Sequence, residues 1–270
     1  PVRTPADAAL RRGGGGGGAA AVAAVSALPR GVRRAMLLRS FAVQGSWNYR
    51  TLIGTGLAFV LAPALRHVYA DDPARLRQAV GRHAELFNAH PYLAALAAGA
   101  IARLEADGVP PETVARFKAA VRGSLGSMGD RLVWLMWRPA CALLMVALLL
   151  AGAGWWIAAA AFLVAYNALH LWMRAWGLDA GWREGLQVAR TLREAPFERL
   201  GERAGDAGAV LSGFAAVLAV GWGGDHGWPY AVLGLAALVA GIALGPRIRW
   251  VAAAALTALL IAGVVLPNNP

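Results

Sequence analysis

The sequence has little charge. Of its 270 residues only 15% are charged, while 58% are hydrophobic and the mean hydropathy is +0.50. Soluble domains usually carry about 25% charged residues. The composition therefore indicates an integral membrane protein.

Lysine is almost absent, since Lys118 is the only one, and arginine carries nearly all of the net charge of +11. Nucleic-acid-binding domains place basic residues on the polar surface of a soluble core. Here long apolar runs dominate, so the positive-inside rule explains the charge better. We expect no nucleic-acid partner.

Cysteine and enzyme signatures are also scarce. Cys141 is the only cysteine, which excludes an intramolecular disulfide and a thiolate metal cluster. The five histidines show no metal-ligand spacing, and no Gly-x-x-x-x-Gly-Lys-Ser/Thr phosphate loop is present. The sequence therefore predicts no catalytic residue, no metal and no cofactor.

The chain divides by composition. Gly13–Gly18 is an unbroken glycine run within residues 1–34, which we interpret as a flexible Gly/Ala-rich cytosolic tail. Residues 35–270 are interpreted as the membrane domain. Residues 35–138 would form amphipathic and re-entrant helices that carry polar motifs, and residues 139–270 would form transmembrane helices.

Five apolar runs in the last half are candidate membrane spans. They are Pro139–Gly152, Trp155–Met173, Ala207–Trp222, Pro229–Gly245 and Trp250–Leu266. Loops with arginine alternate with loops that lack it. This alternation predicts five crossings with a cytoplasmic N-terminus.

The first third has a different pattern. Thr51–Leu65 and Tyr92–Ala102 are apolar but shorter than the roughly 20 residues that cross a bilayer. An amphipathic basic helix is predicted between them, over about Asp72–Leu86. Short apolar helices broken by glycine and proline suggest re-entrant or interfacial segments. The predicted fold is thus an all-α membrane protein with about five transmembrane helices plus N-terminal amphipathic and re-entrant helices.

Three polar motifs interrupt this apolar sequence. They are Arg39–Tyr49, Leu86–Pro91 and Gly126–Asp130, the last followed by Trp134 and Arg138-Pro139. Amides give directional donors and acceptors, carboxylates accept from hydroxyls, and tryptophan offers an apolar face for a sugar ring. The predicted polar sugar path consists of Gln44, Trp47, Asn48, Asn88, His90 and Asp130.

Each of these residues also has a structural interpretation. Gln44 and Asn48, four residues apart on one helix face, would bond to another helix, and Trp47 would be an interfacial anchor. Asn88 would cap a helix. His90 would be a hydrogen-bonded structural histidine. The residue types alone leave both interpretations open.

Asp130 has its own alternatives. It would be a helix N-cap, since it follows a glycine and precedes an apolar run. As a carboxylate at membrane depth it would need a partner, and Arg131 or Arg138 is close in sequence. His83, on the predicted amphipathic helix, is expected at the surface or at a subunit contact.

The three motifs occur in an order that resembles the IID component of the mannose/fructose/sorbose class of bacterial phosphotransferase systems. The resemblance covers about Ala35 to Gly185. It implies an all-helical multi-pass subunit of the bacterial inner membrane that forms a hetero-oligomer with a IIC subunit. Together they would bind a hexose and pass it to the cytosolic face, where a IIB subunit donates the phosphate. The chain itself would be non-catalytic, and lipid would surround it.

Some positions depart from that family pattern. The family usually continues Trp47-Asn48-Tyr49 with Glu, Arg and Met, whereas this chain has Arg50-Thr51-Leu52. The residue after the aspartate is usually serine and here is Arg131. An alternative therefore stays open, namely a diverged IID homologue that does not transport and acts as a membrane scaffold or regulatory partner.

Overall fold

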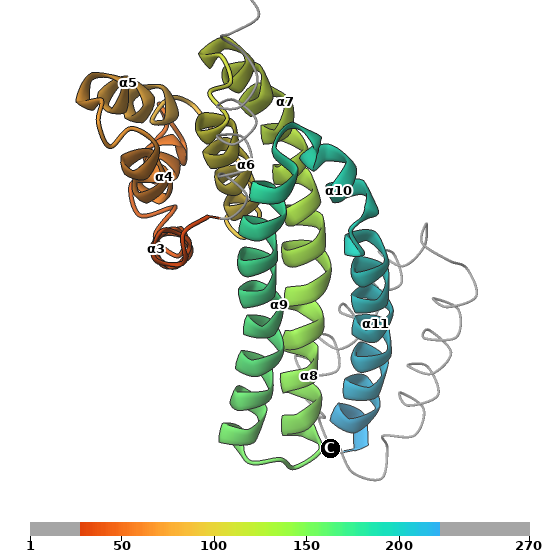
Figure 1. Ribbon diagram of the computed structural model, residues 1–270. Coiled ribbons are helices and arrows are strands. Elements are labelled where there is room, and N and C mark those ends of the chain that lie inside the picture. Colours follow the sequence, from red (N-terminus) through yellow and green to blue (C-terminus); the bar gives the residue numbers. More distant parts are fainter. Residues whose placement is uncertain (1–27, 222–270) are drawn as a thin grey trace, which may run out of the picture. The chain divides into compact units, whose positions relative to one another are not determined.

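The structure is a computed structural model that describes residues 28–221, and this part of the chain is helical (Figure 1). Within it, β-structure is limited to two isolated bridges, Asn48 with Leu52 and Leu52 with Phe87. The elements are α3 (Arg30–Ser40), α4 (Gly54–Val68), α5 (Pro73–His83), α6 (Ala94–Ala106), α7 (Pro111–Gly129), the π-helix η1 (Asp130–Trp137), α8 (Arg138–Leu150), α9 (Trp155–Glu184), the 3₁₀ turn η2 (Gly185–Gln187), α10 (Val188–Glu194) and α11 (Phe197–Gly221). The predicted all-α class is confirmed.

The chain forms two compact units. Of the described residues, the first contains those up to Gly129 together with His170–Ala195, and the second contains Asp130–Leu169 and those from Pro196 to Gly221. The long helix α9 contributes its first half to the second unit and its second half to the first. The domain limits predicted from composition stay a prediction.

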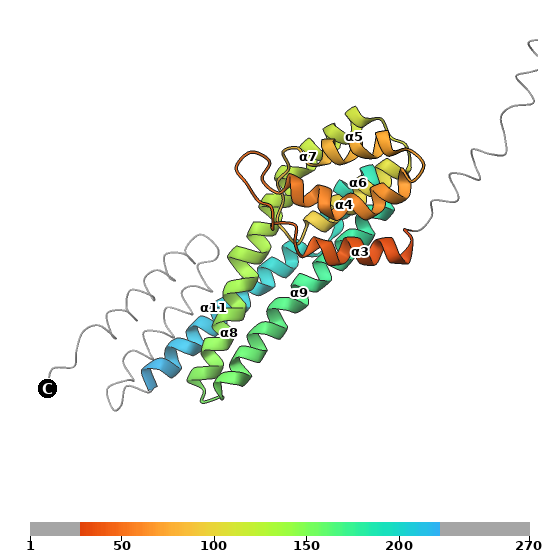
Figure 2. The same cartoon turned by 90° about the vertical axis from the view of Figure 1, so that its left-hand side faces the viewer.

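In the first unit α4 lies between α3 and α5 and also packs on α6 (Figures 1 and 2). The core helix α6 is rich in alanine and is buried on nearly every side. Small residues let its backbone approach α9 closely. A Cβ added to Gly99 would lie 2.2 Å from the Leu178 carbonyl oxygen, and one added to Gly181 would lie 2.1 Å from that of Leu96. Such small-residue contacts are typical of helix packing in membranes.

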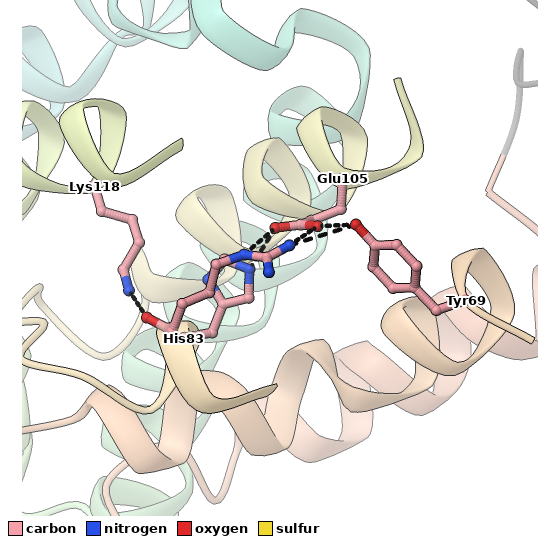
Figure 3. A network of polar contacts seen from close by, with 5 residues as sticks. Tyr69, His83, Glu105 and Lys118 are labelled. Carbon is pink, nitrogen blue, oxygen red and sulfur yellow. Dashed lines mark hydrogen bonds and ion pairs between the residues drawn. The ribbon is translucent and has the colours of Figure 1, made fainter. Parts of the chain in front are cut away.

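A buried carboxylate joins the ends of α4, α5 and α6, and a lysine of α7 bonds to the same group of residues (Figure 3). Glu105 of α6 accepts hydrogen bonds from Tyr69 Oη at 2.5 Å, from Arg82 Nη2 at 2.5 Å and from His83 Nε2 at 2.8 Å. Lys118 of α7 donates to the Arg82 carbonyl oxygen at 2.6 Å. We call these five residues the Glu105 network.

The charge states in the Glu105 network follow from its contacts. Burial by itself would raise the pKa of Glu105, but the hydrogen bonds from His83, Arg82 and Tyr69 prevail and lower it to about 2. Burial lowers the pKa of His83. A neutral His83 therefore donates its Nε2 proton to an ionised Glu105, while Arg82 supplies the opposite charge. The prediction that His83 lies at the surface or at a subunit contact was wrong, because its side chain is fully buried against Glu105 within the unit.

In the second unit α11 packs along α8 and η1, and α8 and α11 lie side by side in Figures 1 and 2. The indole N–H of Trp137 donates to the Ala165 carbonyl oxygen of α9 at 3.2 Å. The π-helix immediately precedes Pro139. Proline lacks an N–H and its ring collides with the carbonyl four residues before it, which accounts for irregular helix geometry at this point.

Two helical stretches, Pro111–Leu150 and Trp155–Ala219, contain segments that are long and apolar enough to cross a membrane. Only 28% and 17% of their most apolar windows are buried, unlike the core helix of a soluble protein. The first three predicted spans coincide with parts of α8, α9 and α11. The last two, Pro229–Gly245 and Trp250–Leu266, lie outside the described residues, so the count of five stays a prediction.

One predicted boundary differs from the structure. The apolar run starting at Trp155 was expected to end at Met173, before a charged loop, but α9 continues as a helix to Glu184. The reason lies in the first unit, where the charged residues of this extension find partners. Asp179 accepts a two-pronged ion pair from Arg33, with both distances 2.6 Å.

Candidate functional site

The first motif begins in the last turn of α3 and continues in the loop that leads to α4. Because α3 ends at Ser40, Gln44 and Asn48 lie in turns and not on one helix face, so that prediction was wrong. The reason is local hydrogen bonding by Asn48, whose side-chain oxygen accepts from the backbone N–H groups of Arg50 at 3.0 Å and Thr51 at 2.9 Å. Asparagine readily stabilises turns in this way.

The Asn48 side chain uses its donors locally as well. Its Nδ2 donates to the Ser46 carbonyl oxygen at 3.1 Å and to Thr51 Oγ1 at 2.8 Å. An amide offers two donors, and its oxygen already serves two N–H groups. The same loop holds Leu52 at a φ of 52°, a rare conformation for a residue with a side chain. Asn48 therefore orders the loop.

The first and second motifs are joined through their backbones. The Phe87 N–H donates to the Thr51 carbonyl oxygen at 3.2 Å, and the Ile53 N–H donates to the Phe87 carbonyl oxygen at 3.1 Å. The Phe87 side chain is fully buried and anchors this junction. The sequence order of the motifs gave no indication of this pairing.

Three of the predicted residues lie at the surface of the joined loops. Gln44 and Asn88 are exposed, and Trp47 is 47% exposed with its ring 4.9 Å from that of Tyr49. Asn88 does not cap a helix as one interpretation held, since the residue before α6 is Leu93. Among the described residues, no hydrogen bond engages the side chain of Gln44 or Asn88. Both amides are available to a ligand.

His90 lies beneath the loops and is buried. Its Nδ1 accepts from the Tyr92 N–H at 3.3 Å, and its ring meets the Tyr92 ring edge-on at 4.8 Å. It also packs against Gly129 of the third motif, where an added Cβ would lie 2.2 Å from the His90 Cβ. Burial, followed by repulsion from Arg174 and His170, lowers its pKa to about 4. His90 is therefore neutral near pH 7.

The sequence interpretation missed a second buried group in this region, built around Arg174 of α9. Its Nε donates to His170 Nε2 at 2.7 Å, and its Nη1 donates to the carbonyl oxygen and, at 3.2 Å, to the Oγ of Ser40. Its guanidinium carbon lies 4.9 Å from the Phe41 ring centre and 5.2 Å from that of Tyr92. We call these five residues the Arg174 cluster.

The Arg174 cluster joins the two motif loops to α9. Ser40 and Phe41 belong to the first motif, and Tyr92, which stacks on His170 at 4.2 Å, follows the second. Arg174 is only 3% exposed, and no carboxylate pairs with it in the part of the chain that the structure describes. Its charge is stabilised instead by the C-terminal carbonyl of α3 and by aromatic faces. Its spacing of four from His170 was the one available sequence signal.

Asp130 belongs to the second unit and is exposed at the start of η1. The N-cap interpretation was wrong, because α7 runs directly into η1 and leaves no helix start there. Over residues 28–221 no ion pair joins Asp130 to Arg131 or Arg138. Arg138 lies 5.7 Å from the centre of the Trp134 ring instead.

The arrangement suits binding better than bond-breaking chemistry. The loops present amides and aromatic rings, and the buried groups beneath them are already engaged in holding the backbone. No group of three or more histidine, cysteine, aspartate or glutamate residues suited to a metal occurs among the described residues.

Comparison with known proteins confirms the family that the three motifs resemble. Residues 27–217 match the family model of the mannose/fructose/sorbose family IID component of the PTS system. The chain is 29% identical over 185 residues to the mannose-specific EIID component of Escherichia coli strain K12, covering 67% of this chain and 65% of that protein. It is 30% identical over 187 residues to the sorbose-specific EIID component of Klebsiella pneumoniae, covering 66% of each.

Solved structures agree with the sequence relatives. The cryo-EM structure of the mannose transporter ManYZ in complex with microcin E492 matches with a TM-score of 0.56 and 28% identity, covering 71% of this chain and 70% of that one. A structure described as a membrane protein matches with a TM-score of 0.61, also at 28% identity. The chain spans 65% of the length of the Escherichia coli relative and 66% of that of the Klebsiella pneumoniae relative.

Proposed function

The chain belongs to the mannose/fructose/sorbose family of phosphotransferase IID components, and we propose that it is the membrane subunit of a phosphoenolpyruvate-dependent sugar permease. With a IIC subunit it forms the translocation unit for a hexose of the mannose type. Phosphate reaches the sugar from a IIB subunit at the cytosolic face, so this chain performs no phosphoryl transfer itself.

One observation carries the proposal, namely the pairing of the two motif loops. Thr51, Ile53 and Phe87 hold the loops together, and the joined loops leave Gln44, Trp47 and Asn88 at their surface. Two amides and an indole face are groups that bind sugar hydroxyls and a pyranose ring.

The other predicted residues have supporting roles in this proposal. Asn48 orders the loop through its four local hydrogen bonds, and His90 fills the space between Tyr92 and Gly129. Asp130 remains a candidate sugar ligand on the second unit, where its carboxylate is exposed.

The proposed location is the bacterial inner membrane. Five crossings with a cytoplasmic N-terminus fit the alternation of basic and non-basic loops. The partners are the IIC subunit in the membrane, the IIB subunit at the cytosolic face, and lipid. The similarity to mannose- and fructose-specific IID components and to the ManYZ transporter supports this assembly.

The departures from the family pattern at Arg50 and Arg131 lie at exposed positions, outside the buried core of the fold. Arg131 does not neutralise Asp130 through an ion pair within the described residues. The non-transporting scaffold is therefore the less favoured interpretation.

The test is phosphoenolpyruvate-dependent phosphorylation of labelled hexoses by membranes that carry the chain with its IIC partner and the cytosolic phosphate carriers. Gln44→Ala is expected to raise the KM for the hexose about tenfold, as expected for loss of one or two hydrogen bonds. Gln78→Ala is the matched control, since Gln78 is an equally exposed amide on α5.

The outcomes separate the two functions. Sugar phosphate that disappears when the chain is omitted supports the permease, and the preferred hexose names the substrate. A stable complex with IIC that phosphorylates no hexose would contradict the permease and support a scaffold.

A further inference from the structure

Helix α3 carries four arginines, and two of them are used inside the first unit. Arg33 makes the two-pronged ion pair with Asp179 of α9, both distances being 2.6 Å. Arg39 donates to the Phe59 carbonyl oxygen at 3.2 Å and lies 4.7 Å from the centre of the Phe59 ring. These two arginines fix α3 on the unit.

The other two arginines, Arg30 and Arg34, make no such contacts within the described part of the chain. Both are exposed, and across residues 28–221 neither forms an ion pair with a carboxylate. They are four residues apart and therefore share one face of the helix. With Arg33 they line a hollow of about 370 Å³, and the first turn of α3 contains no acidic residue. This end of the face is thus strongly basic.

The same face continues into apolar side chains. Leu38 follows Arg34 by four residues and is 71% exposed, and Phe41 follows Leu38 by three and is 47% exposed. A single exposed leucine needs no explanation. Here, however, the apolar pair extends a row of two arginines, which gives one continuous basic-then-apolar face. We call Arg30, Arg34, Leu38 and Phe41 the α3 face.

We propose that the α3 face docks on the surface of an acidic phospholipid bilayer. The guanidinium groups of Arg30 and Arg34 bind lipid phosphates, and Leu38 enters the boundary between headgroups and acyl chains. Phe41 takes part only with the exposed portion of its ring, because the ring also contacts Arg174 and His170. Helices that lie in a membrane interface combine these two features, and basic residues near the anionic leaflet add to their attraction.

Both halves of the α3 face are needed to identify this occupant. A soluble phosphate compound would engage the arginines but would leave Leu38 and Phe41 in water. A zwitterionic lipid such as phosphatidylcholine also carries a phosphate, but its bilayer lacks the net negative charge that attracts the two arginines. The inference depends on the membrane location of the family and not on the sugar, so failure of the transport assay would leave it standing.

The test places a spin label on the α3 face of the full chain in complex with its IIC subunit. The label is attached at Leu38→Cys in a Cys141→Ser background, in nanodiscs of phosphatidylcholine alone or with one part in three of phosphatidylglycerol. Accessibility to oxygen reports the lipid boundary, and accessibility to a water-soluble nickel chelate reports exposure to water.

In acidic discs the label is expected to be accessible to oxygen and shielded from the chelate. The pair Arg30→Gln/Arg34→Gln is expected to lower the ratio of oxygen to chelate accessibility on the order of tenfold, because each arginine near an anionic surface contributes to docking. The matched control Arg66→Gln/Arg77→Gln removes the same charge from exposed positions on α4 and α5 and should leave the ratio unchanged.

Three results would overturn the proposal. The label is accessible to the chelate in every disc, or it is shielded from both reagents because a protein subunit covers it, or both double variants change the ratio equally. Copurification with IIC and unchanged sugar phosphorylation by each variant distinguish loss of docking from misfolding.

Discussion

The first unit buries two charged groups and stabilises them in opposite ways. Glu105 is surrounded by donors, including the cationic Arg82, at 2.5 to 2.8 Å for its shortest contacts. Arg174 is equally buried but has no carboxylate among the described residues, only carbonyl, hydroxyl, imidazole and aromatic partners. One charge is neutralised locally and the other is not.

The difference indicates two purposes. A charge-balanced network such as that of Glu105 holds helix ends in place. The carboxylate is the common hydrogen-bond acceptor of Tyr69, Arg82 and His83. Burial of a cation costs desolvation energy, and without a partner carboxylate no ion pair offsets this cost. Arg174 stands where the first motif, Tyr92 and α9 meet, so we interpret it as a positioning residue for the sugar loops.

The largest expected effect is on stability, from Glu105→Gln. Loss of the carboxylate removes the ion-pair partner of Arg82, and it leaves the buried His83 facing an amide. Removing one partner of a buried pair typically costs about 3–5 kcal/mol. Denaturant unfolding of the solubilised protein measures the loss.

The matched control for Glu105→Gln is Glu194→Gln. Glu194 also accepts an arginine hydrogen bond, from Arg190 at 2.8 Å, but both side chains are exposed. Exposed pairs contribute about 0–1 kcal/mol. Equal effects of the two substitutions would show that the Glu105 network is not a stabilising lock.

Arg174→Met should have a smaller effect on stability and a larger one on transport. Methionine keeps an apolar stem and leaves no carboxylate unpaired, so the loss arises mainly from the Ser40 and His170 hydrogen bonds, at about 1–3 kcal/mol. The first loop then loses its link to α9. We expect hexose phosphorylation to fall at least tenfold, measured by kcat/KM alongside unfolding.

Arg183→Met is the control for Arg174→Met, because it removes an exposed arginine from the same helix. It should leave both stability and kcat/KM nearly unchanged. If Arg174→Met lowered stability as much as Glu105→Gln while active protein transported normally, the proposed contrast between the two groups would be wrong.

The sequence predicts the fold best where a helix is defined by the length of an apolar run. The apolar runs predicted the positions of α8 and the first part of α9, and Ala151–Gly154 is the turn between them, as its glycines and short length suggest. The buried face of α9 beyond Met173 could not be predicted in this way. Its charged residues look like a loop unless their partners, such as Arg33, are known.

The candidate site residues were chosen by residue type, and the sequence did not predict their geometry. Spacing of four suggested a helix over Gln44 and Asn48, whereas side-chain hydrogen bonds of Asn48 favour a turn. The π-helix Asp130–Trp137 lies just before Pro139, and the N-cap interpretation of Asp130 did not take the effect of this proline on the helix into account. Arg174 was overlooked because a partner carboxylate is the usual signal for a buried arginine.

The smallest expected difference separates the two asparagines of the motifs. Asn48→Ala removes four local hydrogen bonds from the loop that contains the strained Leu52, so it should cost about 1 kcal/mol and raise the rate of proteolysis within the loop. Asn88→Ala removes an exposed amide and should change stability by no more than about 0.5 kcal/mol.

Kinetics completes the contrast between Asn48 and Asn88. If Asn88 contacts the sugar, Asn88→Ala raises the KM for the hexose while kcat and the proteolysis pattern stay unchanged. Asn48→Ala instead lowers both kcat and kcat/KM, because the whole loop loses its order and Gln44 and Trp47 lose their positions with it. Identical proteolysis patterns for the two variants would mean that Asn48 does not order the loop. Direct binding of the sugar by Asn48 would then be the favoured interpretation.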